Sequence, residues 1–423
     1  MIETPLIGAA TARLRRTSPL RVDGLLYLVS SIYAAVYAVW PALPTHRLWG
    51  RTAAIPYAVV GLAACALSSR SVRLDPRVMR WLRGALAVIA LVFVLLVPLG
   101  REVTERAKNG FVRHVRSEAI VVEEAARTLS EHKNPYAAVH ETRPLRGYPE
   151  ATHVRFPYLP SMLVFGAARA IWGWVSFGDA RIAFTVVTFV VAGLTAMIWG
   201  RGEQRIRALQ VLILLPTGAL PLVTGGHDVP VLALTLLTLV LLQRHRPVAA
   251  GFALGIAATM RQLVWPLLPL VVLAARRRDG SAARVRTFVA FSIPAVAVNL
   301  PFFVWDPAAF VDDVVRFPLG LTDLSSPAAS PTLGRALSWS PGKLMWLGAL
   351  IAVIAIVAYA RRHRWVISPA EVAAAAGVLL AVAVLMAPSS RWGLLVYGLD
   401  LTAWAWLLRS HDASPGSFDP APA

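Results

Sequence analysis

The sequence predicts an all-α polytopic membrane protein with about twelve transmembrane helices. Of its 423 residues, 57% are hydrophobic and only 15% are charged, whereas soluble domains carry roughly 25% charged residues. Apolar runs that approach or exceed the ~20 residues of a transmembrane helix recur along the chain. The arginines gather in short segments between these runs, as the positive-inside bias requires.

Several classes of site are not indicated. The net charge of +19 does not predict a nucleic-acid partner, because the arginines flank apolar runs instead of forming a soluble basic domain. Cys65 is the only cysteine, so no disulfide can form within the chain. No P-loop, Rossmann or zinc signature occurs, and the Asp312-Asp313 pair has no nearby histidine, so we expect neither a metal nor direct use of nucleotide sugars. Nothing indicates the oligomeric state.

Twelve apolar runs are the expected spans, at residues 23–43, 54–69, 79–99, 157–175, 181–200, 207–224, 228–243, 247–274, 286–304, 343–360, 369–387 and 392–408. They predict a cytosolic N-terminus with three spans (1–99), an outer loop (100–156), core spans (157–304), a second outer loop (305–342), C-terminal spans (343–408) and a disordered cytosolic tail (409–423).

The arginines set the expected orientation in a plasma (inner) membrane. Those at 13, 15, 16 and 21 place the N-terminus in the cytosol, and those at 276–278 return the chain there, so both termini are expected inside. The basic loops 201–207 and 243–247 would then face outward, against the bias. One solution is that 157–175 does not fully cross and that 247–274 breaks near Arg261 into two short helices.

The first outer loop carries an amphipathic stretch, "SEAIVVEEAARTLSEHKNPYAAVH", at 117–140. Its apolar residues recur at helical spacing, at Val121, Val122, Ala125, Ala126 and Leu129. Residues 117–131 are therefore predicted to form a helix lying on the outer membrane surface. Its solvent side is expected to carry Glu123, Glu124, Arg127 and Glu131. Glu118 falls near the membrane-facing edge, where a carboxylate suits a general base for a lipid-linked substrate; the alternative is a solvated helix whose glutamates only keep it polar.

Four motifs carry a resemblance to a known family. They are Glu118, Ala125-Ala126-Arg127, Asn134-Pro135-Tyr136 and Phe156-Pro157-Tyr158-Leu159-Pro160. With "GGHDVPVLALTLL" (225–237) and "RPVAAGFALGIAATMRQLVWPLLPLV" (246–271), they resemble GT-C glycosyltransferases over residues 85–275. The pattern is most similar to polyprenol-phosphate-mannose-dependent mannosyltransferases, both the bacterial lipoglycan type and the first mannosyltransferase of GPI-anchor synthesis.

The resemblance implies inverting transfer of a sugar, mannose in the closest pattern, from a polyprenyl phosphate to a lipid or glycan acceptor on the outer face. It assigns the catalytic base to Glu118; Glu124, another acid on the predicted helix, is the second choice. Three departures stand out: the family pattern has aspartate at Glu118, a second acid at Arg116 and lysine at Arg261. Because catalytic geometry tolerates little displacement, the longer glutamate leaves a non-catalytic relative as an alternative.

Further residues are expected near the reaction. A leaving phosphate needs positive donors, a role that Arg155 and Arg261, assisted by His153, would fill; the alternatives are snorkelling for Arg155 and a structural ion pair for Arg261. His227 and Asp228 head an apolar span, where Asp228 could equally be a helix cap. Three further pocket candidates come from the motifs: Asn134, Tyr136 and Tyr158.

Two other classes of protein compete with this prediction. A membrane transporter would explain twelve spans and two inner termini, but it leaves the long outer loop with its amphipathic helix unexplained. A non-catalytic membrane scaffold would explain the missing aspartate.

Overall fold

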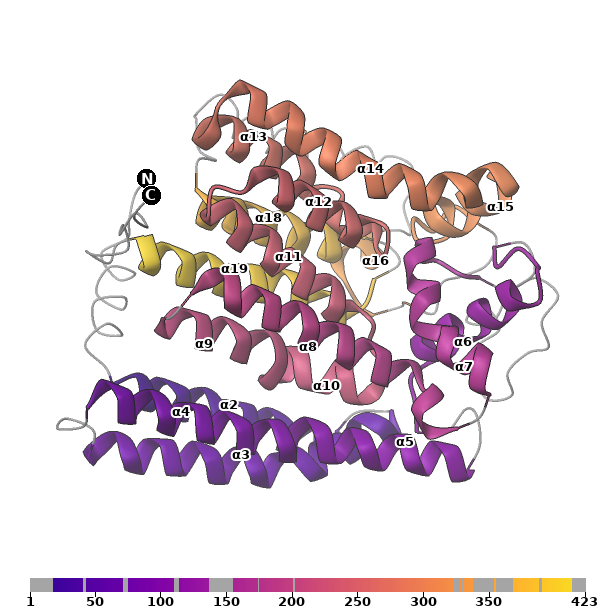
Figure 1. Cartoon of the computed structure of the whole chain (residues 1–423). Coiled ribbons are helices and arrows are strands. Elements are labelled where there is room, and N and C mark those ends of the chain that lie inside the picture. The colour runs from indigo at the N-terminus through magenta and orange to yellow at the C-terminus, as the bar shows by residue number, and fades with distance from the viewer. Residues whose placement is uncertain are drawn as a thin grey trace.

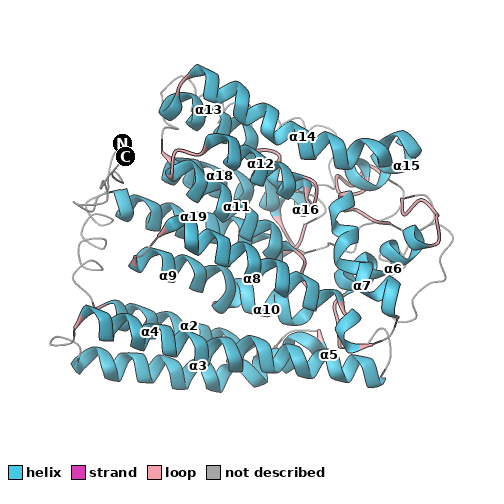
Figure 2. Cartoon of the chain, in the orientation of Figure 1, coloured by secondary structure: helices cyan, strands magenta, loops and turns pink. Residues whose placement is uncertain are grey.

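The computed structural model describes residues 18–40, 43–70, 75–109, 114–136, 155–322 except 174 and 201, 328, 330–337, 354, 368–387 and 390–412. Every element among these residues is a helix, with no strand (Figure 2). Seven helices are long and apolar enough to cross a membrane. They are Pro19–Val39, Pro44–Ser69, Arg77–Asn109, Ala180–Trp199, Glu203–Thr224, Ser281–Trp305 and Pro369–Met386. The chain is therefore an all-α polytopic membrane protein, as predicted; the expected span at 343–360 lies outside the described residues apart from residue 354.

The first helices form one layer, along the lower edge of Figure 1. They are α2 (Pro19–Val39), α3 (Pro44–Arg70), α4 (Pro76–Ala90), the π-helical segment η2 (Leu91–Leu96) and α5 (Val97–Asn109). Glycines let α2 and α3 pack closely: a Cβ on Gly24 would lie 2.9 Å from the carbonyl oxygen of Gly61. Small residues at contacts are how membrane helices gain van der Waals packing without a hydrophobic drive.

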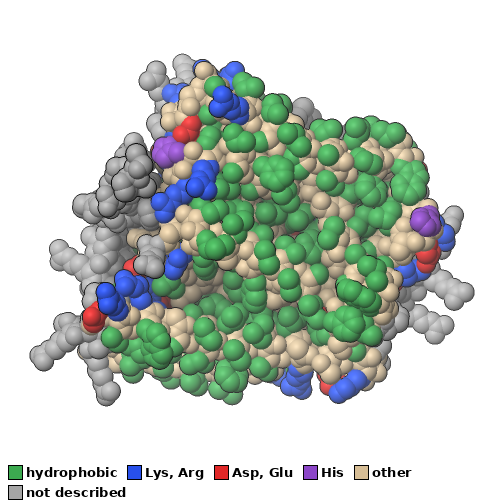
Figure 3. Space-filling model, in the orientation of Figure 1, with side chains coloured by type: hydrophobic (Ala, Val, Ile, Leu, Met, Phe, Trp, Pro, Cys, Tyr) green, Lys and Arg blue, Asp and Glu red, His purple; other side chains and the backbone are tan. Residues whose placement is uncertain are grey.

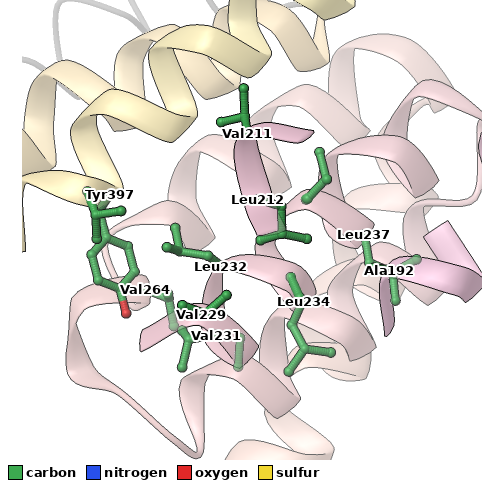
Figure 4. Packing of buried hydrophobic residues seen from close by; sticks show 14 of the residues in the cluster. Ala192, Val211, Leu212, Val229, Val231, Leu232, Leu234, Leu237, Val264 and Tyr397 are labelled. Atoms are coloured by element: carbon green, nitrogen blue, oxygen red, sulfur yellow. The ribbon is translucent and has the colours of Figure 1, made fainter. Parts of the chain in front are cut away.

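The remaining helices stack above this layer. They are α8 (Ala180–Trp199), α9 (Glu203–Leu209), η7 (Gln210–Leu214), α10 (Pro216–Thr224), α11 (Asp228–Gln243), α12 (Pro247–Ala258), α13 (Leu267–Asp279), α14 (Ser281–Trp305), α18 (Pro369–Met386) and α19 (Leu395–Asp412). Helix α11 lies at the centre, and residues 229–242 are all buried, as expected for a helix that is apolar all round. Figure 4 shows its valines and leucines together with Leu212 of η7, Ala192 of α8 and Tyr397 of α19.

Two segments do not cross as single helices. Helix α7 (Leu163–Trp172) has only 10 residues, about 15 Å, roughly half of a ~30 Å hydrocarbon core. The run at 247–274 ends α12 at Ala258, turns through η8 (Gln262–Val264) and continues as α13. The backbone of this break is satisfied by the segment before α7: Ser161 N donates to Thr259 O at 3.0 Å. The proposed break near Arg261 is confirmed.

These half-length segments explain the position of the two basic loops that conflicted with the charge bias. Arg83 forms ion pairs with both Asp23 of α2 and Glu203 at the start of α9. The ends of α8 and α11 also meet, because Arg244 donates to the Trp199 carbonyl. Both loops thus lie at the end of the bundle where α2 begins, which we call the arginine-rich end. Charged side chains gather toward the two ends of the face in Figure 3, and hydrophobic ones cover its middle.

The opposite end carries α6 (Ser117–Ser130), which confirms the helix predicted at 117–131 to within one residue. Helix α6 packs on α7 and α8 there (Figure 1). Also at this end are η5 (Pro160–Met162), η6 (Ser176–Gly178), α15 (Pro307–Val311), η9 (Asp312–Arg316) and η10 (Trp392–Leu394); α16 (Leu333–Leu337) precedes residues that are not described. We call this the α6 end.

Candidate active site

The start of α6 docks on the turn between α10 and α11. Arg116 N donates to Thr224 O at 2.8 Å. Gly225 follows with φ 108°, a left-handed conformation that favours glycine, and a Cβ there would lie 3.2 Å from Ala119 Cβ. The glycine therefore permits the close approach that brings Glu118 beside His227.

Glu118 is held by two arginines. Its residue is 6% exposed, and its Oε1 atom accepts hydrogen bonds from Arg116 Nη2 and from Arg391 Nη1. Ser117 Oγ lies 3.4 Å from the other carboxylate oxygen, Oε2. Burial acts to raise the pKa of Glu118, but the guanidinium groups of Arg116 and Arg391 outweigh it and hold this pKa well below its usual range. The carboxylate is thus ionised and buried.

Arg261 lies in the break between α12 and α13. Its Nε donates to Asp228 Oδ1 at 3.0 Å, and the Tyr397 hydroxyl donates to the same oxygen at 2.8 Å. The guanidinium carbon lies 5.2 Å from the centroid of the Tyr158 ring, within cation–π range. Three chain segments thus converge on Arg261, and it reaches an acidic residue, as expected for a charge at membrane depth.

His227 is a buried polar side chain near Asp228 and Glu118. It is 3% exposed, and neither ring nitrogen hydrogen bonds to any described residue. Its ring centroid lies 4.3 Å from that of Tyr158, and Nε2 is 3.9 Å from Asp228 Oδ1. Burial lowers the pKa of His227 to about 4, opposed by Asp228 and Glu118. The imidazole is therefore neutral near pH 7.

Arg155 has other partners. Its Nη1 donates to Asp312 at 3.1 Å and to Asp313 at 2.9 Å, and the second oxygen of Asp313 accepts from Phe156 N at 2.9 Å. Asp312 also pairs with Arg316 at 3.1 Å, and the two aspartates tie the segment before α7 to η9. His153, the other candidate here, lies outside the described residues.

Asn134 and Tyr136 form hydrogen bonds that hold the segment before α7. Asn134 Oδ1 accepts from Tyr136 N at 3.0 Å, and the Tyr136 hydroxyl donates to Tyr158 O at 3.0 Å. The Tyr136 ring packs against Phe156 and Phe310, with centroids 5.4 and 4.9 Å away. Both residues are buried; Tyr136 positions Tyr158 through its hydrogen bond, and Asn134 Nδ2 has no hydrogen-bond partner among the described residues.

The expectation that Glu123 faces solvent is wrong. Its side chain is fully buried and accepts from both terminal nitrogens of Arg106, at 2.9 and 2.7 Å. Arg106 also pairs with Asp179 at 2.8 Å, and Ala180 N donates to Glu123 at 2.9 Å. The helix is covered on this side by the end of α5 and the start of α8. Glu124 instead pairs with the exposed Arg127 at 2.8 Å.

A comparison with protein-family models now bears on this site. The model described as glycosyltransferase family 87 matches residues 156–388, which is more than half of the chain. The chain belongs to glycosyltransferase family 87. No curated protein matches it.

In this family 87 glycosyltransferase the site draws on residues inside and outside the matched segment. Tyr158, His227 and Arg261 lie inside it, whereas Glu118 and Arg391 lie outside. Among the described residues no group of three or more His, Cys, Asp or Glu side chains is placed to hold a metal ion.

Sequence reasoning missed two members of the site. Arg391 directly precedes an apolar run, so the rule that singled out His227 and Asp228, an ionisable group at the lip of a span, would have found it. Arg116 was noted only as a departure from the family pattern. Its pairing with Glu118 depends on a side-chain conformation that spacing does not reveal.

Proposed function

We propose that this glycosyltransferase moves a sugar, with mannose as the first to test, from a polyprenyl phosphate to a lipid or glycan acceptor. The reaction takes place at the α6 end, facing outward from the plasma membrane, with both termini in the cytosol. One observation carries the proposal: Glu118 is an ionised, buried carboxylate at one end of the helical bundle, with arginines around it. An ionised carboxylate can accept a proton in the transition state, and its proton affinity rises when the arginines that hold it pair with another anion.

In the proposed reaction, Glu118 takes the proton of the acceptor hydroxyl. The acceptor oxygen forms a bond to C1 of the sugar as the bond from C1 to the phosphate oxygen breaks. The electron pair leaves on the phosphate, whose negative charge increases from one unit to two, and the configuration at C1 inverts. Positive groups directed at that phosphate stabilise the transition state more than the ground state.

Arg261 suits this phosphate role better than Arg155. Arg261 shares one carboxylate oxygen of Asp228 with Tyr397. Its guanidinium packs against the Tyr158 ring, and Tyr158 lies within electrostatic range of both Arg261 and Glu118. Arg155 faces two aspartates, twice the counter-charge that Arg261 meets in Asp228. We therefore assign the phosphate contact to Arg261 and a supporting role to Arg155.

A transfer assay tests the proposal. Membranes containing the protein are incubated with radiolabelled polyprenyl-phosphate mannose and a lipid extract as acceptor, and labelled product is separated. Glu118→Gln should lower the rate by about 10²–10⁴-fold, the usual contribution of a general base. Glu118→Asp should retain part of the activity because the carboxylate remains.

Glu131→Gln is the matched control, since Glu131 pairs with an exposed arginine, Arg127, at the far end of α6, and it should leave the rate unchanged. Normal transfer by Glu118→Gln would place the base elsewhere, and Glu124 would be tested next. A wild-type protein that transfers no sugar from any polyprenyl phosphate would refute the donor class and favour a non-catalytic relative.

A further inference from the structure

Two arginines from distant parts of the chain converge on one oxygen atom. Arg116 precedes α6 and Arg391 precedes α19, and both donate to Oε1 of Glu118. Like charges approach this closely in a buried site only around an anion. Among the described residues, each guanidinium has Glu118 as its only ion-pair partner, although a guanidinium carries five N–H donors. Most of their donor capacity is therefore uncommitted within the described part of the chain.

The accessible part of this cluster is positive. The side chains of Arg116 and Arg391 are 17% and 29% exposed, whereas that of Glu118 is 7% exposed. An anion approaching from outside therefore meets the guanidiniums before it meets the carboxylate. Planar guanidiniums bind phosphate with paired N–H donors, so the site favours a phosphate over a chloride-like point charge.

We propose that Arg116 and Arg391 bind the donor phosphate together with Arg261, and that Glu118 is the internal counter-ion of Arg116 and Arg391 until that phosphate displaces it. The proposal rests on the proposed function. It assigns one pair of arginines two successive anions: first the carboxylate of the base, then the phosphodiester of the lipid-linked sugar. Arrival of the donor therefore releases the base at the moment when a substrate is present.

The charges of the cluster fit this exchange. Arg116, Arg391 and Glu118 together carry +1, the nearby Arg261 and Asp228 cancel, and His227 is neutral. A phosphodiester carries one negative charge, so the occupied site is balanced. After transfer the proton is on Glu118 and the leaving phosphate carries the second negative charge, so the balance is kept. When Glu118 loses that proton, it again competes for the arginines and helps to expel the spent lipid phosphate.

Binding of a sugar-free lipid tests the proposal apart from catalysis. The full-length protein in lipid nanodiscs is titrated with farnesyl phosphate, and with farnesol as the control for the lipid tail. Glu118→Gln removes the competing anion and should bind farnesyl phosphate about tenfold more tightly than wild type, although its transfer rate falls by about 10²–10⁴-fold. Arg391→Gln and Arg116→Gln should bind it at least tenfold more weakly, and Arg391→Lys should recover part of the loss. Glu131→Gln should match wild type.

Unchanged farnesol affinity and apparent Tm show that the variants are folded. If Glu118→Gln abolishes transfer but binds farnesyl phosphate no more tightly than wild type, the counter-ion exchange is wrong and the proposed function stands. Arg391→Gln with wild-type affinity for farnesyl phosphate would likewise overturn the exchange. A wild-type protein that neither binds farnesyl phosphate nor uses a polyprenyl-phosphate sugar would overturn both the exchange and the proposed donor.

Discussion

Replacing Glu123 with glutamine should destabilise the protein far more than the same change at its neighbour Glu124. Glutamine can keep the hydrogen bonds that Glu123 Oε1 accepts from Arg106 Nη1 and Ala180 N. It turns the other oxygen into an NH₂ group that faces two donors, Arg106 Nη2 at 2.7 Å and Arg169 Nε at 3.5 Å. A charge-assisted hydrogen bond worth about 1.5–3 kcal/mol is lost, and a buried guanidinium loses a counter-charge.

Breaking a buried pair in this way costs about 3–5 kcal/mol. One kcal/mol moves the Tm of a 150–250-residue domain by about 2–4 °C, so the apparent Tm of this larger chain in detergent should fall by several degrees. Glu124→Gln, which breaks a pair with a half-exposed arginine, should cost under about 1 kcal/mol. Equal Tm values for the two variants would refute the view that the buried cluster anchors α6.

Two further outcomes follow from the turn between α10 and α11. Gly225→Ala should cost about 1–2 kcal/mol from the left-handed backbone alone, and it should lower transfer activity by pushing Ala119, and with it the start of α6, away; a variant with full activity and stability would contradict this. His227 binds a proton at about pH 4 in the folded protein but near pH 6.5 when unfolded, so its contribution to stability falls as pH drops from 6.5 to 4. His227→Gln should remove up to about 3 kcal/mol of that pH dependence, measured as the difference in apparent Tm against pH between variant and wild type.

The features that the sequence predicted well are those set by membrane insertion. An arginine inside a 28-residue apolar run is expensive, which predicted the break at Arg261. Basic loops on the wrong side of the membrane predicted that 157–175 does not fully cross. Both conclusions needed only local hydrophobicity and charge, which act on each segment separately.

The features that could not be predicted depend on contacts between distant segments. An amphipathic pattern assumes one covered face, but α6 is covered on two sides, and the burial of Glu123 depends on Arg106 arriving from α5. Arg391 lies 273 residues from its partner Glu118. Spacing along the chain carries no information on such a pair, although the type of residue at the lip of a span does.

The long helix 77–109 has a buried arginine clamped near each end. Arg83 is held by Asp23 and Glu203 at the arginine-rich end, and Arg106 by Glu123 and Asp179 at the α6 end. At about 1.5 Å per residue the two lie roughly 35 Å apart, close to the ~30 Å thickness of a hydrocarbon core. With both ends fixed to different helices, this span cannot slide to suit its surroundings. A bilayer of another thickness must therefore be accommodated by tilt of the whole bundle or by deformation of the lipid, which couples the position of the α6 end to lipid chain length.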